Sequence, residues 1–127
     1  MSLTAAGYLL VVQTWDLMEV AAPDGTRDPV VIHSDNEARA VLIRLNPGQK
    51  LGDHQVKENA WLTVIDGRIR VAAGGESVEA GPGVLFRFAP DERHSVASED
   101  GARILLMLAP WPGDGHYRGS QIVARPA

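Results

Sequence analysis

The sequence predicts an all-β domain built from short antiparallel strands with little helix. Short apolar and β-branched runs recur along the chain, and turn-forming residues separate them at intervals of about eight to twelve residues. The 13 glycines and 8 prolines are spread over the chain, which favours tight turns over a helical bundle. This pattern is typical of an antiparallel sandwich or barrel, and 127 residues suffice for a single domain with one core.

The first part of the chain contains three expected strands and one short helix. Residues 8–13 are apolar and β-branched, which predicts a strand, and residues 14–20 are predicted as a short helix whose first threonine is the N-cap. Residues 30–34 and 38–45 are two further strand-forming runs. The polar residues 35–37 between them predict a hairpin.

An Asp66-Gly67 pair lies between two more strand-forming runs, residues 60–66 and 68–73. Aspartate and glycine tolerate the positive φ values of a type I′ turn, so these two runs are predicted to pair as a hairpin. In the second run, isoleucine and valine alternate with arginine. This alternation predicts one buried face and one solvated face.

The second half of the chain predicts four more strands, at residues 76–80, 84–88, 94–97 and 103–108. Phe86 and Phe88 alternate with Arg87, so both rings are expected to point inward.

Regular structure is not expected beyond Ala109, where prolines and glycines are frequent. We therefore divide the chain into an N-terminal strand and short-helix segment that packs on the barrel (1–29), the barrel itself (30–108) and a Pro/Gly-rich tail (109–127). Trp111, His116 and Tyr117 lie in the tail. Three arrangements of the tail are compatible with the sequence: it closes over the mouth of the barrel, it lies across a partner subunit, or it is a disordered extension.

Charge and composition exclude several classes of function. A formal charge of −4, a pI near 5.5 and no run of lysines or arginines argue against a nucleic-acid partner. The absence of cysteine excludes disulfides, thiolate metal sites and a cysteine nucleophile. The longest early apolar run, residues 8–12, is too short for a membrane span or the core of a signal peptide. We expect a cytoplasmic protein with no membrane partner.

Two stretches of the sequence are similar to the two motifs of the cupin superfamily. The first motif reads Gly, His, His, Glu and Gly in that family; at the same spacing this chain has Gly48, His54, Val56, Ala60 and Gly67.

The second cupin motif begins with Gly and continues with Pro, Gly, His and Asn. The matching residues here are Gly83, Ala89, Asp91, His94 and Ser98. The resemblance covers residues 30–108, and it is to the small single-domain bacterial cupins. The metal-binding motifs of this chain are degenerate.

The resemblance implies a jelly-roll barrel of two antiparallel sheets with an internal pocket, and often a homodimer. In metal-binding cupins three histidines and a glutamate hold the ion. His54 and His94 match two of those ligands, whereas Val56 and Ala60 replace a histidine and the glutamate. Valine and alanine have no lone pair to donate, so we predict no firmly held cofactor. A divalent transition metal, such as iron, manganese, zinc or nickel, remains the alternative.

The motif positions and strand parity define an expected ligand pocket. Its predicted residues are His54, Val56, Ala60, Leu62, Phe86 and His94. Trp61 has the opposite parity and is expected on the outer face, where an exposed tryptophan favours an interface.

Four functions are compatible with this pocket. The first, which the loss of two metal ligands from otherwise intact motif spacing favours, is a small-molecule-binding or regulatory protein without a firmly held metal. The second is a metal-dependent oxygenase or isomerase that uses His54 and His94, with water, substrate or Glu58 completing the coordination. The third is a metal-free isomerase or epimerase with His54 as the base, and it would also need an aspartate and a tyrosine. The fourth is a purely structural module whose interior is filled by side chains.

Overall fold

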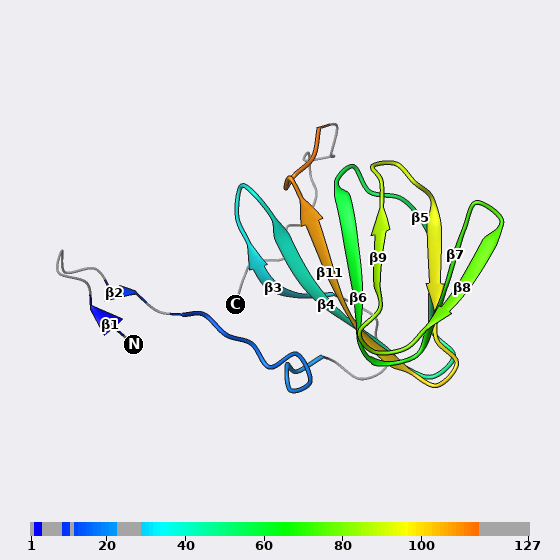
Figure 1. Ribbon diagram of the computed structural model, residues 1–127, viewed down its shortest axis with the longest axis horizontal. Helices are drawn as coiled ribbons and strands as arrows, with labels where there is room; N and C mark the ends of the chain where they lie inside the picture. The colour runs from blue at the N-terminus through cyan, green and yellow to red at the C-terminus, as the bar shows by residue number, and fades with distance from the viewer. Residues whose placement is uncertain (1, 4–8, 11, 23–28, 115–127) are drawn as a thin grey trace.

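The computed structural model describes residues 2–3, 9–10, 12–22 and 29–114, and within them it is an antiparallel jelly-roll barrel (Figure 1). One sheet has five strands in the order β3 (Val30–Ser34), β4 (Arg39–Leu45), β11 (Ala102–Ala109), β6 (Asn59–Gly67) and β9 (Leu85–Phe88). The other has four, in the order β5 (Lys50–His54), β10 (His94–Ala97), β7 (Ile69–Ala73) and β8 (Glu76–Ala80).

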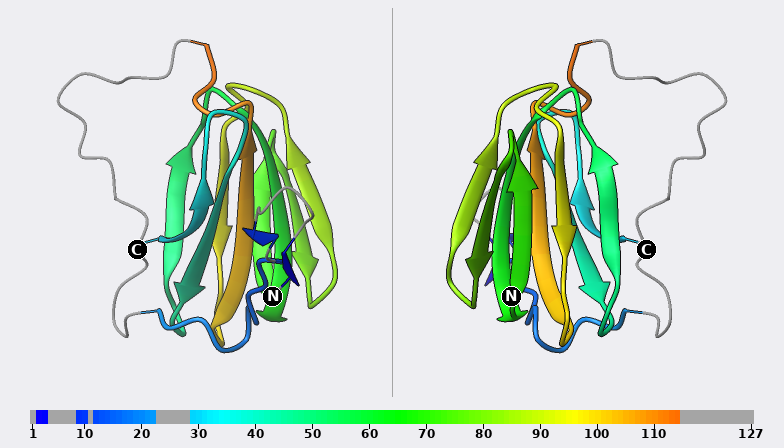
Figure 2. Two further views of the ribbon diagram at one scale, coloured as in Figure 1. Left: turned by 90° about the vertical axis from the view of Figure 1, so that its left-hand side faces the viewer. Right: turned by 90° about the vertical axis from the view of Figure 1, so that its right-hand side faces the viewer.

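The two sheets face each other and enclose the core, as the side views in Figure 2 show. Alternate residues of β4, β6, β7 and β11 point into this core, as expected for strands with one buried face. Among them are Ile43, Leu62, Val64, Val71 and Ile104. The predicted all-β barrel with little helix is therefore confirmed.

The hairpin between β3 and β4 is confirmed, and Asp35 forms its turn. The Asp35 Oδ1 atom accepts the backbone N–H groups of Glu37 at 2.8 Å and Ala38 at 2.9 Å. A hairpin also joins β7 and β8, where Gly74 and Gly75 take φ values of 59° and 82°. Such positive values favour glycine, which has no Cβ.

The predicted hairpin at Asp66-Gly67 is wrong. β6 and β7 do not pair with each other, because β6 lies in the five-stranded sheet and β7 in the four-stranded sheet. Gly67 does take a positive φ of 79°, but there the chain passes from one sheet to the other. A local turn signal identifies the bend, whereas the partner of each strand is decided by the packing of the whole barrel.

The predicted helix at residues 14–20 is also wrong. The backbone makes a single turn, in which the Asp16 carbonyl accepts the N–H groups of Glu19 at 2.9 Å and Val20 at 3.0 Å. The Asp16 side chain, rather than Thr14, accepts the Met18 N–H. One turn is too short to offset the cost of helix nucleation.

The strand expected at residues 8–13 lies partly outside the described residues. Within that range the structure assigns β2 (Leu9–Leu10), which pairs with β1 (Ser2–Leu3) in a separate two-stranded sheet. None of the described residues belongs to a helix long and apolar enough to cross a membrane.

Gly67→Ala is expected to lower the free energy of unfolding by at least about 3 kcal/mol. A left-handed backbone costs a non-glycine residue roughly 1–2 kcal/mol. In addition, the new Cβ would collide with the Gly101 carbonyl and lie 2.7 Å from the Ala102 Cα. Gly74→Ala is the control, because its Cβ would meet nothing within 4 Å. Urea denaturation of both variants tests this prediction, and equal losses would contradict it.

Candidate functional site

His54 and His94 lie opposite each other on neighbouring strands. Their Cα atoms are partners in the antiparallel register of β5 and β10. The two imidazole rings meet edge to face, with centroids 4.2 Å apart and an interplanar angle of 60°. The structure thus brings together the two histidines that the sequence singled out, forty positions apart.

A stack of aromatic rings from the opposite sheet covers His94. The Phe88 ring lies parallel to the His94 ring at 3.8 Å, and Phe86 is stacked against Phe88 at 6.3 Å. Both phenylalanines come from β9, so the stack joins the two sheets. The sequence predicted that Phe88 points inward, but its contact with His94 could be identified only from the three-dimensional structure.

Both imidazoles use Nδ1 to bond a backbone carbonyl. His54 Nδ1 lies 2.7 Å from the Gly52 oxygen, and His94 Nδ1 lies 3.0 Å from the Glu92 oxygen. A carbonyl oxygen only accepts hydrogen bonds, so Nδ1 must carry the proton in both rings. In each neutral ring the lone pair is therefore on Nε2.

Burial lowers the pKa of His94, and the nearby His54 lowers it further. The bond to the Glu92 carbonyl and the charges of Glu92 and Asp53 act in the opposite direction. Burial is the largest of these effects because it penalises the charged imidazolium. The balance favours a neutral His94 that accepts a hydrogen bond at Nε2.

The motif positions other than the histidines connect the two motifs. Asp91, where the family has glycine, takes a positive φ of 64°. Its backbone N–H donates to the Val56 carbonyl at 2.8 Å, and its carboxylate pairs with Lys57 at 2.8 Å. The buried Ser98, where the family has asparagine, donates its hydroxyl to the Arg68 carbonyl at 2.7 Å.

The other predicted pocket residues lie in or against the core. Ala60 and Leu62 are buried within it, and Val56 and Phe86 pack against it. Trp61 faces the other way, as its parity predicts, and the Arg87 guanidinium lies 6.0 Å from the centroid of its ring.

His54 lines a cavity of about 430 Å³ between β5 and the β3–β4 edge of the other sheet. Its remaining lining residues are Pro29, Ile43, Leu51, Gly52 and Asp53. Asp53 was not predicted as a site residue, and only its place beside His54 in the sequence could have suggested it. The cavity gives a small molecule access to His54, whereas the buried His94 does not line it.

Glu58 is buried and binds the tail. Its Oε2 atom accepts the Gly113 N–H at 2.7 Å. The tail is held further by the Trp111 N–H, which donates to the Glu37 carbonyl at 3.1 Å, and by the Arg39 guanidinium, 4.6 Å from the centroid of the Trp111 ring. Up to residue 114 the tail thus packs on its own barrel. His116 and Tyr117 lie outside the described residues.

These side chains do not fit the metal site of the family. Within the described ranges, no three histidine, cysteine, aspartate or glutamate side chains lie close enough together to hold an ion. His54 and His94 supply two nitrogen donors, while Val56 and Ala60 supply none. A tightly held zinc ion in proteins commonly has at least three protein ligands.

The arrangement required for an epimerase is also incomplete in the described part of the chain. The partner of His54 Nδ1 is the Gly52 carbonyl and not a carboxylate. The two tyrosines of the sequence, Tyr8 and Tyr117, fall outside the described residues.

The sequence profile of the cupin domain matches residues 41–109, more than half of the chain, and the protein belongs to the cupin family. None of the curated proteins matches it.

Several solved structures share the fold. A conserved protein with a double-stranded β-helix domain from Klebsiella pneumoniae superposes with a TM-score of 0.70 at 19% identity, over 84% of this chain and 95% of that one. An RmlC-like cupin from Desulfovibrio desulfuricans gives 0.70 at 18% identity, over 79% and 98%. A cupin superfamily protein from Desulfitobacterium hafniense gives 0.67 at 9% identity, over 73% and 85%. At these identities the likeness defines the fold alone.

The free energy of unfolding is expected to decrease as the pH is lowered, because of His94. In the folded chain the pKa of His94 lies below its ordinary value of 6.5. As the pH falls, the unfolded chain therefore binds more protons than the folded chain. The contribution of His94 is complete above pH 6.5 and is lost as the pH falls from there towards the folded pKa. When the free energy of unfolding is measured by urea denaturation between pH 8 and 5, His94→Gln should remove the part of its pH dependence that comes from His94. His33→Gln, at an exposed position, is the control. A pH dependence of the free energy of unfolding that His94→Gln leaves unchanged would contradict the prediction.

Proposed function

We propose that this cupin binds a small neutral molecule at the His54–His94 pair, and that it does so without a firmly held metal. The tautomer of the two rings carries this proposal. With both Nδ1–H groups bonded to carbonyls, the pair offers two Nε2 acceptors, so the favoured ligand presents a hydroxyl or another hydrogen-bond donor. A carboxylate would need at least one protonated ring, which the burial of His94 opposes.

The surroundings of His54 favour the same class of ligand. Pro29, Ile43 and Leu51 line the cavity with apolar surface. Asp53 in the same wall would repel an anion. A small ligand with an apolar body and one donor group matches both features.

A metal-dependent enzyme is the second candidate. A backbone carbonyl on Nδ1 is also how many metal-bound histidines are oriented, which leaves Nε2 to face the ion. With two donors from the chain, substrate or water would have to complete the coordination. Glu58 is already engaged with Gly113.

Metal content separates the two candidates. Protein purified without an affinity tag or chelator is expected to contain well below one equivalent of any transition metal by inductively coupled plasma mass spectrometry. Its melting temperature should be the same with and without EDTA. One equivalent of a single metal that survives dialysis and disappears in His94→Ala would establish the second candidate instead.

Matched aromatic probes test the ligand class. Phenol is expected to bind roughly fivefold more tightly than anisole, since one hydrogen bond contributes about 1 kcal/mol. Benzoate should bind more weakly than phenol at pH 8 and gain affinity as the pH falls. Binding is followed by the NMR signals of the histidine rings.

The control for this titration is a pair of variants. His54→Phe keeps a ring but removes the acceptor, so it should abolish the preference for phenol over anisole. His33→Phe, at an exposed position, should leave that preference intact. Tightest binding of benzoate at pH 8, or no perturbation of either ring by any probe, would contradict the proposal.

A further inference from the structure

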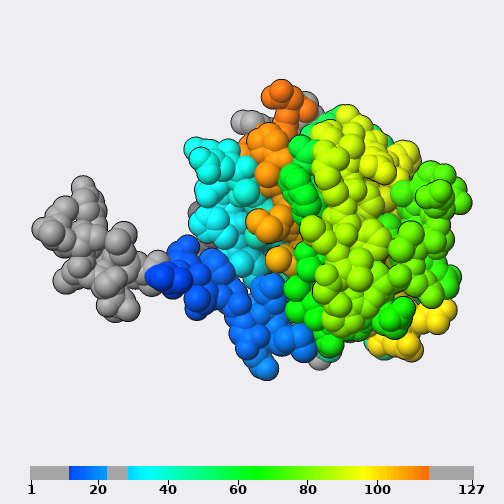
Figure 3. Space-filling model, in the orientation of Figure 1, coloured from blue at the N-terminus to red at the C-terminus, as the bar shows by residue number. Residues whose placement is uncertain are grey.

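Residues 12–22 form a strap on the outer face of the five-stranded sheet. The Arg103 guanidinium, on β11, donates hydrogen bonds to the carbonyls of Leu17 at 3.1 Å and Val20 at 2.8 Å. Figure 3 shows the strap (blue) lying against the barrel beside β3 (cyan). The second half of the strap is thus fixed to the barrel by directed hydrogen bonds.

A groove of about 530 Å³ lies between the strap and the sheet. Trp15 and Leu17 line it from the strap, and Ala40, Leu105 and Met107 line it from β4 and β11. Its volume is within the range of small-molecule sites, about 300–1,000 Å³. The described residues that line it include no lysine or arginine, and none of them lines the cavity beside β5. The groove is therefore a candidate site separate from that cavity.

An imidazole, that of His33, also lines the groove. The pairing of β3 with β4 shifts its register between Val31 and His33, as at a β-bulge, and this shift sets His33 opposite Ala40. Bulges re-aim side chains and are frequent next to functional sites. The His33 Nε2 atom lies 3.1 Å from the Asp35 Oδ2 atom.

The Asp35 carboxylate fixes the tautomer of the His33 ring. Its Oδ1 atom accepts the backbone N–H groups of Ala38 at 2.9 Å and Glu37 at 2.8 Å, and these two bonds are the main reason that the pKa of Asp35 is lowered. An ionised carboxylate only accepts hydrogen bonds, so the proton of His33 lies on Nε2. In the neutral ring the lone pair is then on Nδ1, which leaves an acceptor for a ligand.

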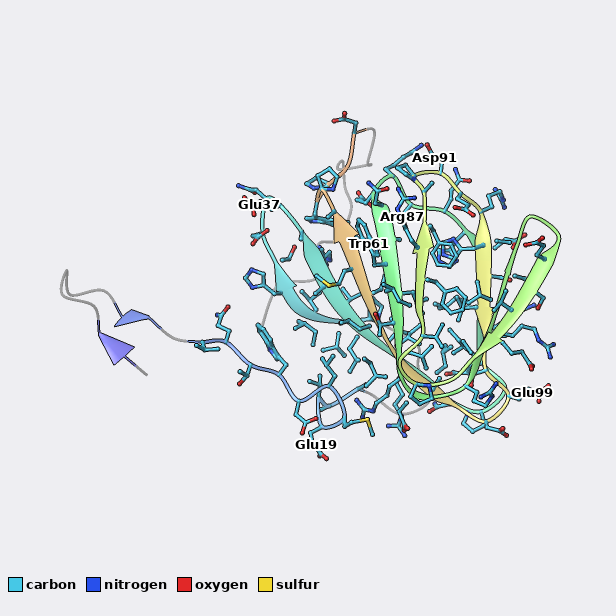
Figure 4. The ribbon with its side chains drawn as sticks, viewed as in Figure 1. Glu19, Glu37, Trp61, Arg87, Asp91 and Glu99 are labelled. Atoms are coloured by element: carbon cyan, nitrogen blue, oxygen red, sulfur yellow. The ribbon has the colours of Figure 1, made fainter. Side chains whose placement is uncertain are left out.

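The charges next to His33 are negative. Asp35 and Glu37 both belong to the turn between β3 and β4, and Figure 4 shows Glu37 at the tip of this hairpin. Arg39, which follows the turn, is engaged elsewhere, since its guanidinium lies 4.6 Å from the centroid of the Trp111 ring. This end of the groove therefore attracts a positive charge and repels a negative one.

We propose that the groove binds a small apolar molecule that carries a protonated amine. The ammonium group donates a hydrogen bond to His33 Nδ1 and is attracted by the Asp35 carboxylate on the other side of the ring. The apolar body of the molecule lies against Leu105 and Met107. Trp15, which is 43% exposed, adds an aromatic surface of the kind on which apolar cations bind.

Three probes of similar size and different charge test the ligand class. At pH 8 the cation 2-phenylethylamine should bind roughly fivefold more tightly than neutral 2-phenylethanol, because a charge-assisted hydrogen bond replaces a neutral one. The anion 3-phenylpropionate should bind most weakly. Binding is followed by the NMR signals of the His33 ring and of the Trp15 indole N–H group.

Asp35→Asn tests the role of the carboxylate. The asparagine oxygen can still accept the two backbone N–H groups of the turn, whereas its NH₂ group would donate to His33 Nε2 and move the ring proton to Nδ1. The variant should lose the preference for the amine over the alcohol, and the ring-nitrogen spectrum of His33 should show the other tautomer. Asp100→Asn is the matched control, since Asp100 lies in the exposed turn between β10 and β11, and it should keep both.

His33→Phe is the second variant should circular dichroism show that Asp35→Asn fails to fold, and it should abolish the same preference. Equal or tighter binding of the alcohol or the carboxylate at His33 would overturn the proposal. A preference for the amine that neither variant reduces would overturn it too, as would signal changes confined to His54 and His94.

Sedimentation of the wild-type chain and of Met107→Glu, with and without the amine, tests for another occupant of the groove. The proposal requires that the amine binds at His33 whatever the oligomeric state. A dimer that excludes the amine and that Met107→Glu dissociates would mean that a second copy fills the groove, and it would overturn the proposal.

Discussion

The pairing of β10 with β5 is the contact on which the candidate site depends. It sets His94 opposite His54, and the stacking of the two sheets then places Phe88 on the His94 ring. The resulting burial lowers the pKa of His94 and so favours its neutral form, while the Glu92 carbonyl accepts the hydrogen bond from Nδ1. The ability of the pair to accept a hydrogen bond is thus a consequence of the fold.

The strands and turns were predictable where residues close together in the sequence determine them. Alternation in the run around Ile69 and Val71 identified the buried face of β7, and the polar turn at Asp35 identified the β3–β4 hairpin. The same reasoning failed at Gly67, because a tight bend serves equally to reverse a strand or to pass between sheets. It also failed at residues 14–20, where the chain follows contacts of Arg103 with the Leu17 and Val20 carbonyls.

The site was predictable in part. Motif spacing identified His54 and His94, and the missing ligands at Val56 and Ala60 were visible in the sequence. The ring stack on His94 and the bond from Gly113 to Glu58 were not predictable, since each joins residues that only the barrel brings together. The choice of tautomer was not predictable either, because it depends on the exact backbone geometry at Gly52 and Glu92, two residues before each histidine. For the same reason, the sequence left open whether the imidazoles donate or accept hydrogen bonds.

The most direct measurement is the ring-nitrogen NMR spectrum of ¹⁵N-labelled protein at pH 8, recorded before and after addition of one equivalent of Zn²⁺. We expect a protonated Nδ1 and an unprotonated Nε2 in both His54 and His94, with no stoichiometric change on zinc addition. A protonated Nε2 in either ring would contradict the proposed acceptor pair. Saturation of both Nε2 signals by one equivalent of zinc would show that the two histidines still form a metal site.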